Sequence, residues 1–142
     1  MYSSAVVHGS DLALRADLEP LLIKYKVDIC IWGHIHSLER TAPVNNGTVV
    51  KPNFWTGRNN APIHLVIGTG GRFLYPEFFD PQPSWSLFRD ALFGYARFTF
   101  FRNSTFHYEF IANNGSAIID EVSYLSLRTQ NRATARRQTK LK

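Results

Sequence analysis

The chain of 142 residues is 44% hydrophobic, 14% aromatic and 19% charged, a composition typical of a globular domain and not of a disordered chain. No apolar run of about 18 residues occurs, which excludes a membrane-spanning helix, and a single cysteine excludes an internal disulfide framework. The net charge is +5, yet residues 1–127 carry 10 Lys and Arg against 11 Asp and Glu, because six basic residues follow position 127. We therefore expect a near-neutral domain over residues 1–127, a basic and disordered tail over residues 128–142, and no specific binding of nucleic acid.

The beginning of the chain predicts a helix that leads into a strand. Apolar residues recur with helical spacing over residues 10–26, and Ser10 or Asp11 can cap this helix. Pro20 lacks an N–H group, so we expect the helix to kink there or to restart. Residues 27–32 are short and apolar, which predicts a strand buried on both faces. A helix followed by a buried strand is half of an α/β unit.

The rest of the chain is predicted to be rich in antiparallel strands. Candidate strands, separated by Asn, Gly, Pro and Ser turns, lie at residues 48–51, 63–67, 95–101, 105–111 and 117–124. Residues 68–94 form a long irregular segment, and a loop of that length is usually functional or packs on another surface. Its first four residues, Gly-Thr-Gly-Gly, either present backbone N–H groups to an anion or simply end a strand. The expected fold class is α/β (α+β), with a helix–strand start and a β-rich antiparallel end.

The clearest chemical feature is a pair of histidines directly after the first predicted strand. Gly33 is followed by His34 and His36, and in an extended segment residues i and i+2 point to the same side. Ligands bind preferentially at the carboxyl end of a strand in an α/β sheet, and imidazole is a common ligand of zinc and iron. The pattern predicts a metal role, although His-X-His alone also occurs without a metal.

Other reactive residues have ordinary structural explanations. His64 and His107 lie in predicted strands, and Cys30 is expected to be a small buried residue. Glu39 and Arg40 follow the histidine pair and are either an ion pair that orients the histidine loop or a surface pair.

Three Asn-X-Ser/Thr sequences suggest glycosylation at Asn46, Asn103 and Asn114, all in predicted turns. Turns use these residue types in any case, so the alternative is that the sequences are turns and nothing more. The N-terminus has neither the basic nor the apolar region of a signal peptide. If the sites are used, the complete protein is secreted or lies in the secretory lumen, and its signal precedes Met1.

Several motifs together resemble the purple acid phosphatases, which are dinuclear metallophosphoesterases. The family's last metal-binding motif is Gly-His-X-His, commonly followed by X-X-Glu-Arg, and the likeness covers roughly residues 1–125. The matching stretches are Leu18-Glu19-Pro20-Leu21-Leu22, Lys24-Tyr25-Lys26-Val27-Asp28, Gly33-His34-Ile35-His36, Glu39-Arg40, Ala61-Pro62-Ile63, Gly68-Thr69-Gly70-Gly71, and Phe93-Gly94-Tyr95-Ala96-Arg97-Phe98 through to Asp120. The resemblance implies part of a metallophosphoesterase-type sandwich and hydrolysis of phosphomonoesters by attack of a metal-bound hydroxide.

The resemblance also assigns roles to individual residues. His34 would bind the divalent ion (Zn, Mn or Fe(II)) and His36 the Fe(III). His8 falls where the family places a histidine that contacts phosphate and protonates the leaving oxygen. The family often has two adjacent histidines at that place, whereas this chain has one.

The family's other metal-binding motifs do not occur in these 142 residues. Gly-Asp-X-Gly, Gly-Asp-X-X-Tyr and Gly-Asn-His-Asp/Glu are absent, so His34 and His36 are the ligands present. The chain is therefore expected to be a C-terminal part, as a fragment, a truncated gene model or a degenerate relative, and to be inactive in isolation. The alternative is a non-catalytic accessory or binding protein that kept the fold after losing the metal site.

Overall fold

The computed structural model describes residues 1–51, 60–103 and 105–125, and the predicted tail at 128–142 lies outside them. Within these ranges there are one helix and nine strands. The elements are α1 (Leu12–Lys24), β1 (Ile29–Trp32), β2 (Leu38–Thr41), β3 (Val44–Asn45), β4 (Thr48–Val49), β5 (Ile63–Ile67), β6 (Ser86–Asp90), β7 (Gly94–Phe100), β8 (Thr105–Ala112) and β9 (Ile118–Leu125). In this part of the chain, no helix is long and apolar enough to cross a membrane.

The helix α1 lies close to its predicted position and packs through one row of leucines. Asp11 is the N-cap, and its side chain accepts a hydrogen bond from the backbone N–H of Leu14. The leucines at four-residue spacing, Leu14, Leu18 and Leu22, pack against a cluster of Met1, Tyr2 and Val44. The predicted restart at Pro20 is wrong, because the helix continues through it. Pro20 is exposed, so the hydrogen bond that it cannot make is lost at the surface and not in the core.

A four-stranded mixed sheet in the order β1-β5-β2-β6 forms the centre of the molecule. β1 runs parallel to β5, whereas β2 is antiparallel to both β5 and β6. The expectation that β1 is buried on both faces is wrong: it is an edge strand, and Ile31 is 54% exposed. The sequence analysis also missed β2 and β6, because their polar residues break the regular alternation of apolar and polar side chains that predicts a strand. In addition, β6 lies within the segment that was expected to be irregular.

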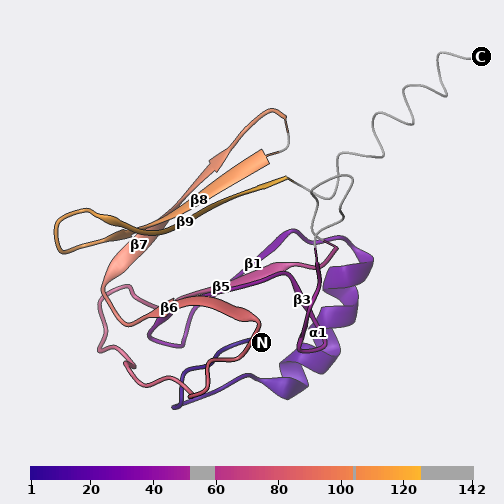
Figure 1. The fold of residues 1–142 in the computed structure, drawn as a ribbon, viewed down its shortest axis with the longest axis horizontal. Helices are drawn as coiled ribbons and strands as arrows, with labels where there is room; N and C mark the ends of the chain where they lie inside the picture. Colours follow the sequence, from indigo (N-terminus) through magenta and orange to yellow (C-terminus); the bar gives the residue numbers. More distant parts are fainter. Residues whose placement is uncertain (52–59, 104, 126–142) are drawn as a thin grey trace, which may run out of the picture.

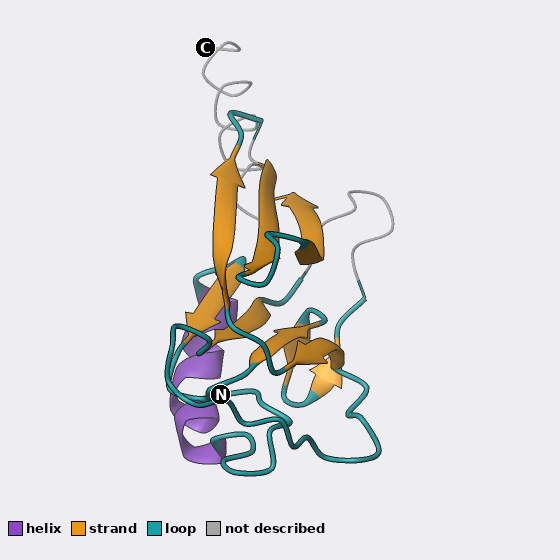
Figure 2. Ribbon diagram, turned by 90° about the vertical axis from the view of Figure 1, so that its left-hand side faces the viewer, coloured by secondary structure: helices purple, strands orange, loops and turns teal. Residues whose placement is uncertain are grey.

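The predicted antiparallel end is confirmed as a three-stranded meander of β7, β8 and β9. It packs on the four-stranded sheet through a core to which Leu38 and Leu65 contribute from one sheet and Tyr108 and Phe110 from the other. In Figure 1 the meander and α1 lie on opposite sides of the central sheet, and Figure 2 shows the meander extending beyond it. The fold is thus a mixed α/β sandwich of helix, sheet and sheet, in agreement with the expected class.

Candidate metal centre

The histidine loop, residues 33–37, leaves the end of β1 in two tight turns. The N–H of Ile35 bonds to the carbonyl of Gly33 at 2.9 Å, and the N–H of Ser37 bonds to the carbonyl of Ile35 at 2.8 Å. His34 has a φ of 70°, in the left-handed region that non-glycine residues rarely adopt. The expectation of an extended loop is therefore wrong. The observed strain is of the kind that concentrates at functional sites.

A glycine on the neighbouring strand end explains why the loop can fold in this way. Gly68 follows β5, and a Cβ atom there would clash with the carbonyl oxygen of Ile35. Its backbone N–H donates to the carbonyl of Ser37 at 3.2 Å. The Gly-Thr-Gly-Gly sequence thus ends a strand, and its first glycine lets the histidine loop lie directly against the backbone.

The fold brings His8 and His36 against one tyrosine, and His34 against His8. The ring centroids of His8 and His34 are 4.9 Å apart, and the ring of Tyr75 lies 5.5 Å from that of His8. Tyr75 also stacks on His36, with ring centroids 4.9 Å apart and an interplanar angle of 5°. Three histidines from two separate segments of the chain therefore form one cluster.

The imidazole of His36 is held in an orientation suited to a metal ligand. Its Nδ1 lies 2.8 Å from the carbonyl oxygen of Phe73, and the backbone N–H of Tyr75 donates to the carbonyl of His36 at 2.8 Å. Because a carbonyl oxygen can only accept, Nδ1 carries the hydrogen, and in the neutral imidazole Nε2 then has the free lone pair that a metal ligand needs. Histidine ligands usually donate their second ring N–H to such an acceptor, so this residue fits a metal site.

A cavity of about 350 Å³ lies beside His8 and His34. It is lined by Met1, Tyr2, His8, Gly9, Asp11, Leu14, Trp32, Gly33, His34, Ile35 and Val66. The imidazoles of His8 and His34 both line this wall, and an imidazole N–H can donate a hydrogen bond to an anion.

Glu39 does not pair with Arg40 in the structure. Its buried carboxylate accepts hydrogen bonds from the backbone N–H and the hydroxyl of Ser4, at 2.7 and 2.6 Å, and from the hydroxyl of Ser86 at 2.6 Å. Arg40 instead forms two 2.7 Å hydrogen bonds with Asp120 on β9. Glu39 therefore fixes the segment that leads to His8, and Arg40 joins the two sheets.

Sequence reasoning missed Phe73, Tyr75 and Ser4 as neighbours of the site. The only signal for the two aromatic residues was the length of segment 68–94, which was expected to be functional or to pack on another surface. No spacing rule connects Ser4 to Glu39, because their contact bridges 35 residues of sequence.

His64 and Cys30 are structural, as expected. His64 is fully buried, and its Nδ1 accepts a 2.9 Å hydrogen bond from the Trp32 indole. Burial lowers its pKa to about 3, so it is neutral at ordinary pH. Cys30 is buried, and burial raises the pKa of its thiol to about 11.

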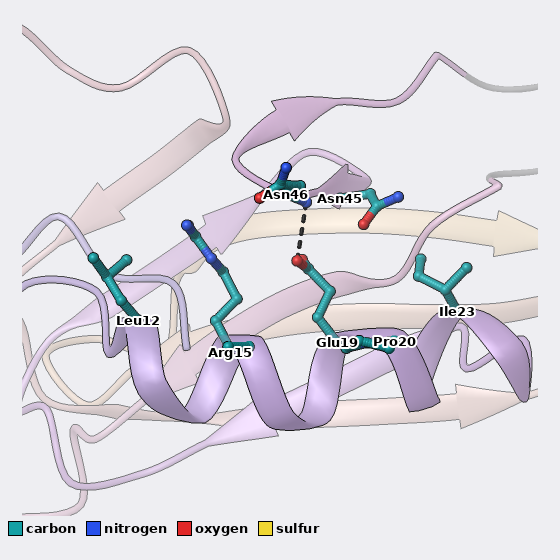
Figure 3. Close-up of a pocket in the computed structure, with 8 residues that line it drawn as sticks. Leu12, Arg15, Glu19, Pro20, Ile23, Asn45 and Asn46 are labelled. Carbon is teal, nitrogen blue, oxygen red and sulfur yellow. Dashed lines mark hydrogen bonds between the residues drawn. The ribbon is translucent and has the colours of Figure 1, made fainter.

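A second cavity, of about 420 Å³, lies between α1 and the β3–β4 turn, next to the possible glycosylation site at Asn46 (Figure 3). The buried carboxylate of Glu19 anchors this turn by accepting the backbone N–H of Asn46 at 3.0 Å and the hydroxyl of Tyr2 at 2.6 Å. Asn46, Asn103 and Asn114 are all exposed in the structure, in the turns where the sequence predicted them.

The chain is similar in sequence and structure to purple acid phosphatases. The family model described as iron/zinc purple acid phosphatase-like protein C matches residues 61–121. "Probable inactive purple acid phosphatase 1" of Arabidopsis thaliana is 40% identical over 108 residues, 75% of this chain and 18% of that protein. Purple acid phosphatase 1 of Ipomoea batatas is 35% identical over 129 residues, 84% of this chain and 27% of that protein. The structure of purple acid phosphatase PPD1 from yellow lupin seeds superposes with a TM-score of 0.75 and 30% identity, covering 88% of this chain and 23% of that chain.

The similarity to these relatives, together with the shared two-sheet fold, places the chain among the metallophosphoesterases. More specifically, it belongs to the purple acid phosphatase family and corresponds to the C-terminal part of that fold. It spans less than a third of the length of these relatives. At the level of the family, the complete enzymes are hydrolases with a dinuclear iron/zinc centre.

Proposed function

We propose that His8, His34 and His36 form the C-terminal share of a phosphatase active site that hydrolyses phosphomonoesters in the complete protein. The observation that carries this proposal is the cluster in which His8 and His36 contact Tyr75 and His34 contacts His8. The Phe73 carbonyl binds Nδ1 of His36, so Nε2 is the nitrogen that is available to a metal. The matched family and the position of the loop at the end of β1 support it.

In this proposal His36 binds Fe(III) and His34 binds a divalent ion, Zn, Fe or Mn. When bound, the two ions would activate a water molecule and stabilise charge on the phosphate. His8 is the proton donor: its ring lies beside that of His34 and lines the same cavity, so it can protonate the leaving oxygen of an ester held there. Glu39 positions His8, because it holds Ser4 four residues earlier.

The rest of the proposal concerns the complete protein. Residues 1–127 are part of a catalytic domain whose other metal ligands lie outside these 142 residues, and the complete protein is secreted or lies in the secretory lumen. The exposure of Asn46, Asn103 and Asn114 supports that location. Two histidines cannot satisfy two ions, so the chain by itself is expected to be inactive.

The test is mutagenesis of an enzyme completed with the upstream part of a relative. His36→Ala should lower both metal content and turnover, and His34→Ala should remove the divalent ion preferentially. His8→Ala should leave the metals in place and slow hydrolysis by about 10²–10⁴-fold. That loss should be greatest for alkyl phosphates, since their leaving groups need a proton, and smaller for nitrophenyl phosphate.

Each role has a result that would contradict it. Loss of both metals in His8→Ala, or an equal slowing of both esters with unchanged KM, would remove His8 from the role of acid. Full metal content and activity in both loop variants would contradict the proposed site. A completed enzyme that is correctly folded and inactive with every ester would favour the accessory-protein alternative.

A further inference from the structure

A second group of metal-binding side chains lies on the three-stranded sheet, away from the histidine loop. His107 and Glu109 are two residues apart on β8, so they point to the same face, opposite the core residues Tyr108 and Phe110. Glu121 on β9 pairs directly with Glu109, and Ser123 pairs with His107. One imidazole and two carboxylates therefore meet on the outer face of the meander.

The imidazole of His107 is aimed at the two carboxylates. Its Nδ1 lies 2.8 Å from the hydroxyl of Ser123, which fixes the plane of the ring. Its Nε2 then lies 3.9 Å from Oε1 of Glu109 and 3.7 Å from Oε2 of Glu121, and the three ligand atoms are all within 4.8 Å of one another. Ligands bound tetrahedrally to zinc at about 2.0–2.1 Å are about 3.3 Å apart, so small side-chain movements would close the site.

The charges at this place are unbalanced. Two glutamates directly opposite each other across a ladder repel. Arg97 on β7 compensates one of them through a two-pronged contact with Glu109, at 2.8 and 2.9 Å, and these hydrogen bonds hold the pKa of Glu109 below its ordinary value. Glu121 is 61% exposed at its side chain and has the imidazole beside it, so a cation between His107 and the two carboxylates would offset the repulsion.

We propose that His107, Glu109 and Glu121 form a binding site for a divalent ion of the zinc class, with the remaining positions open to water. The imidazole favours zinc over magnesium or calcium, which prefer all-oxygen sites. Arg97 weakens the site, since it holds the carboxylate that the ion needs. Because each carboxylate oxygen has two lone pairs, Glu109 can bind the ion while it still accepts a hydrogen bond from Arg97. The ion and Arg97 therefore compete for Glu109 without excluding each other.

The experiment is a calorimetric titration of the full chain with Zn²⁺. The background is the double variant His34→Ala/His36→Ala, so that the histidine loop contributes nothing and the result is independent of the proposed phosphatase site. One Zn²⁺ per chain is expected, with Mg²⁺ as the control ion that does not bind. Adding His107→Ala should weaken binding at least about 10-fold. Glu121→Gln should also weaken it, and this exposed position leaves folding intact.

The decisive variant is Arg97→Gln, which should tighten zinc binding because it releases Glu109. A purely structural cluster gives no reason for such a gain. The proposal is overturned if the background chain binds no Zn²⁺, if His107→Ala binds it equally well, if Arg97→Gln fails to tighten binding, or if Mg²⁺ binds as well as Zn²⁺.

Discussion

The fully buried His64 should make the folded chain less stable in acid, by an amount that can be calculated. Its Nδ1 accepts a hydrogen bond from Trp32, so Nε2 carries the hydrogen, and within the described part of the chain Nε2 has no hydrogen-bond partner. Protonation would place a charge in a site with 0% exposure. Burial therefore lowers the pKa from 6.5 to about 3.

The free energy of unfolding should decrease in acid, because the unfolded chain binds more protons at His64 than the folded chain. Between pH 6.5 and 3 the unfolded chain binds a proton at His64 and the folded chain does not, so stability falls as the pH falls through this range. Each pH unit corresponds to about 1.36 kcal/mol, so at pH 4.5, two units below the unfolded value, the free energy of unfolding is lower by about 2.7 kcal/mol from this residue alone.

The assay is urea denaturation of the natural chain and of His64→Asn at pH 7.5 and pH 4.5. The asparagine side-chain oxygen replaces Nδ1 as the acceptor for Trp32 and does not titrate. Other acidic groups change stability equally in both proteins, so the natural chain should lose about 2.7 kcal/mol more than the variant between the two pH values. An equal loss in both proteins would show that His64 titrates normally in the folded state and would refute the reasoning.

Three further predictions concern the loop, the metals and the glycans. Gly68→Ala should destabilise the chain by about 1–3 kcal/mol in urea denaturation, because the added Cβ would meet the Ile35 carbonyl. Gly70→Ala is the control and should be near neutral, because this position has open space around it. Equal effects of the two substitutions would refute the close contact at Gly68. After dialysis, the His107→Ala chain should retain no stable pair of metal ions by elemental analysis, and two ions per chain would contradict the ligand count. In a secretory host with an added signal peptide, mass spectrometry should find glycan on at least one of the exposed sequon residues, Asn46, Asn103 and Asn114; unmodified peptides at all three would remove the sequon argument for secretion.

The sequence by itself determined the elements whose signals are local. The helical spacing of the leucines and the Asp11 cap located α1, and the turn residues between the candidate strands located β5 and the final meander. The Gly-His-X-His motif identified the loop that carries the candidate ligands, because that motif is continuous in the chain.

Only the tertiary structure decided the features that depend on distant residues. Whether β1 is buried on both faces depends on its place in the sheet order. β2 and β6 form strands because they pair with neighbouring strands, and their polar sequences do not predict this pairing. The turns of the histidine loop depend on Gly68, and the orientation of His36 depends on the carbonyl of Phe73, 37 residues away. Spacing rules describe neighbours within one helix or strand, whereas these contacts form when separate segments pack together, and their partners are set by the whole fold.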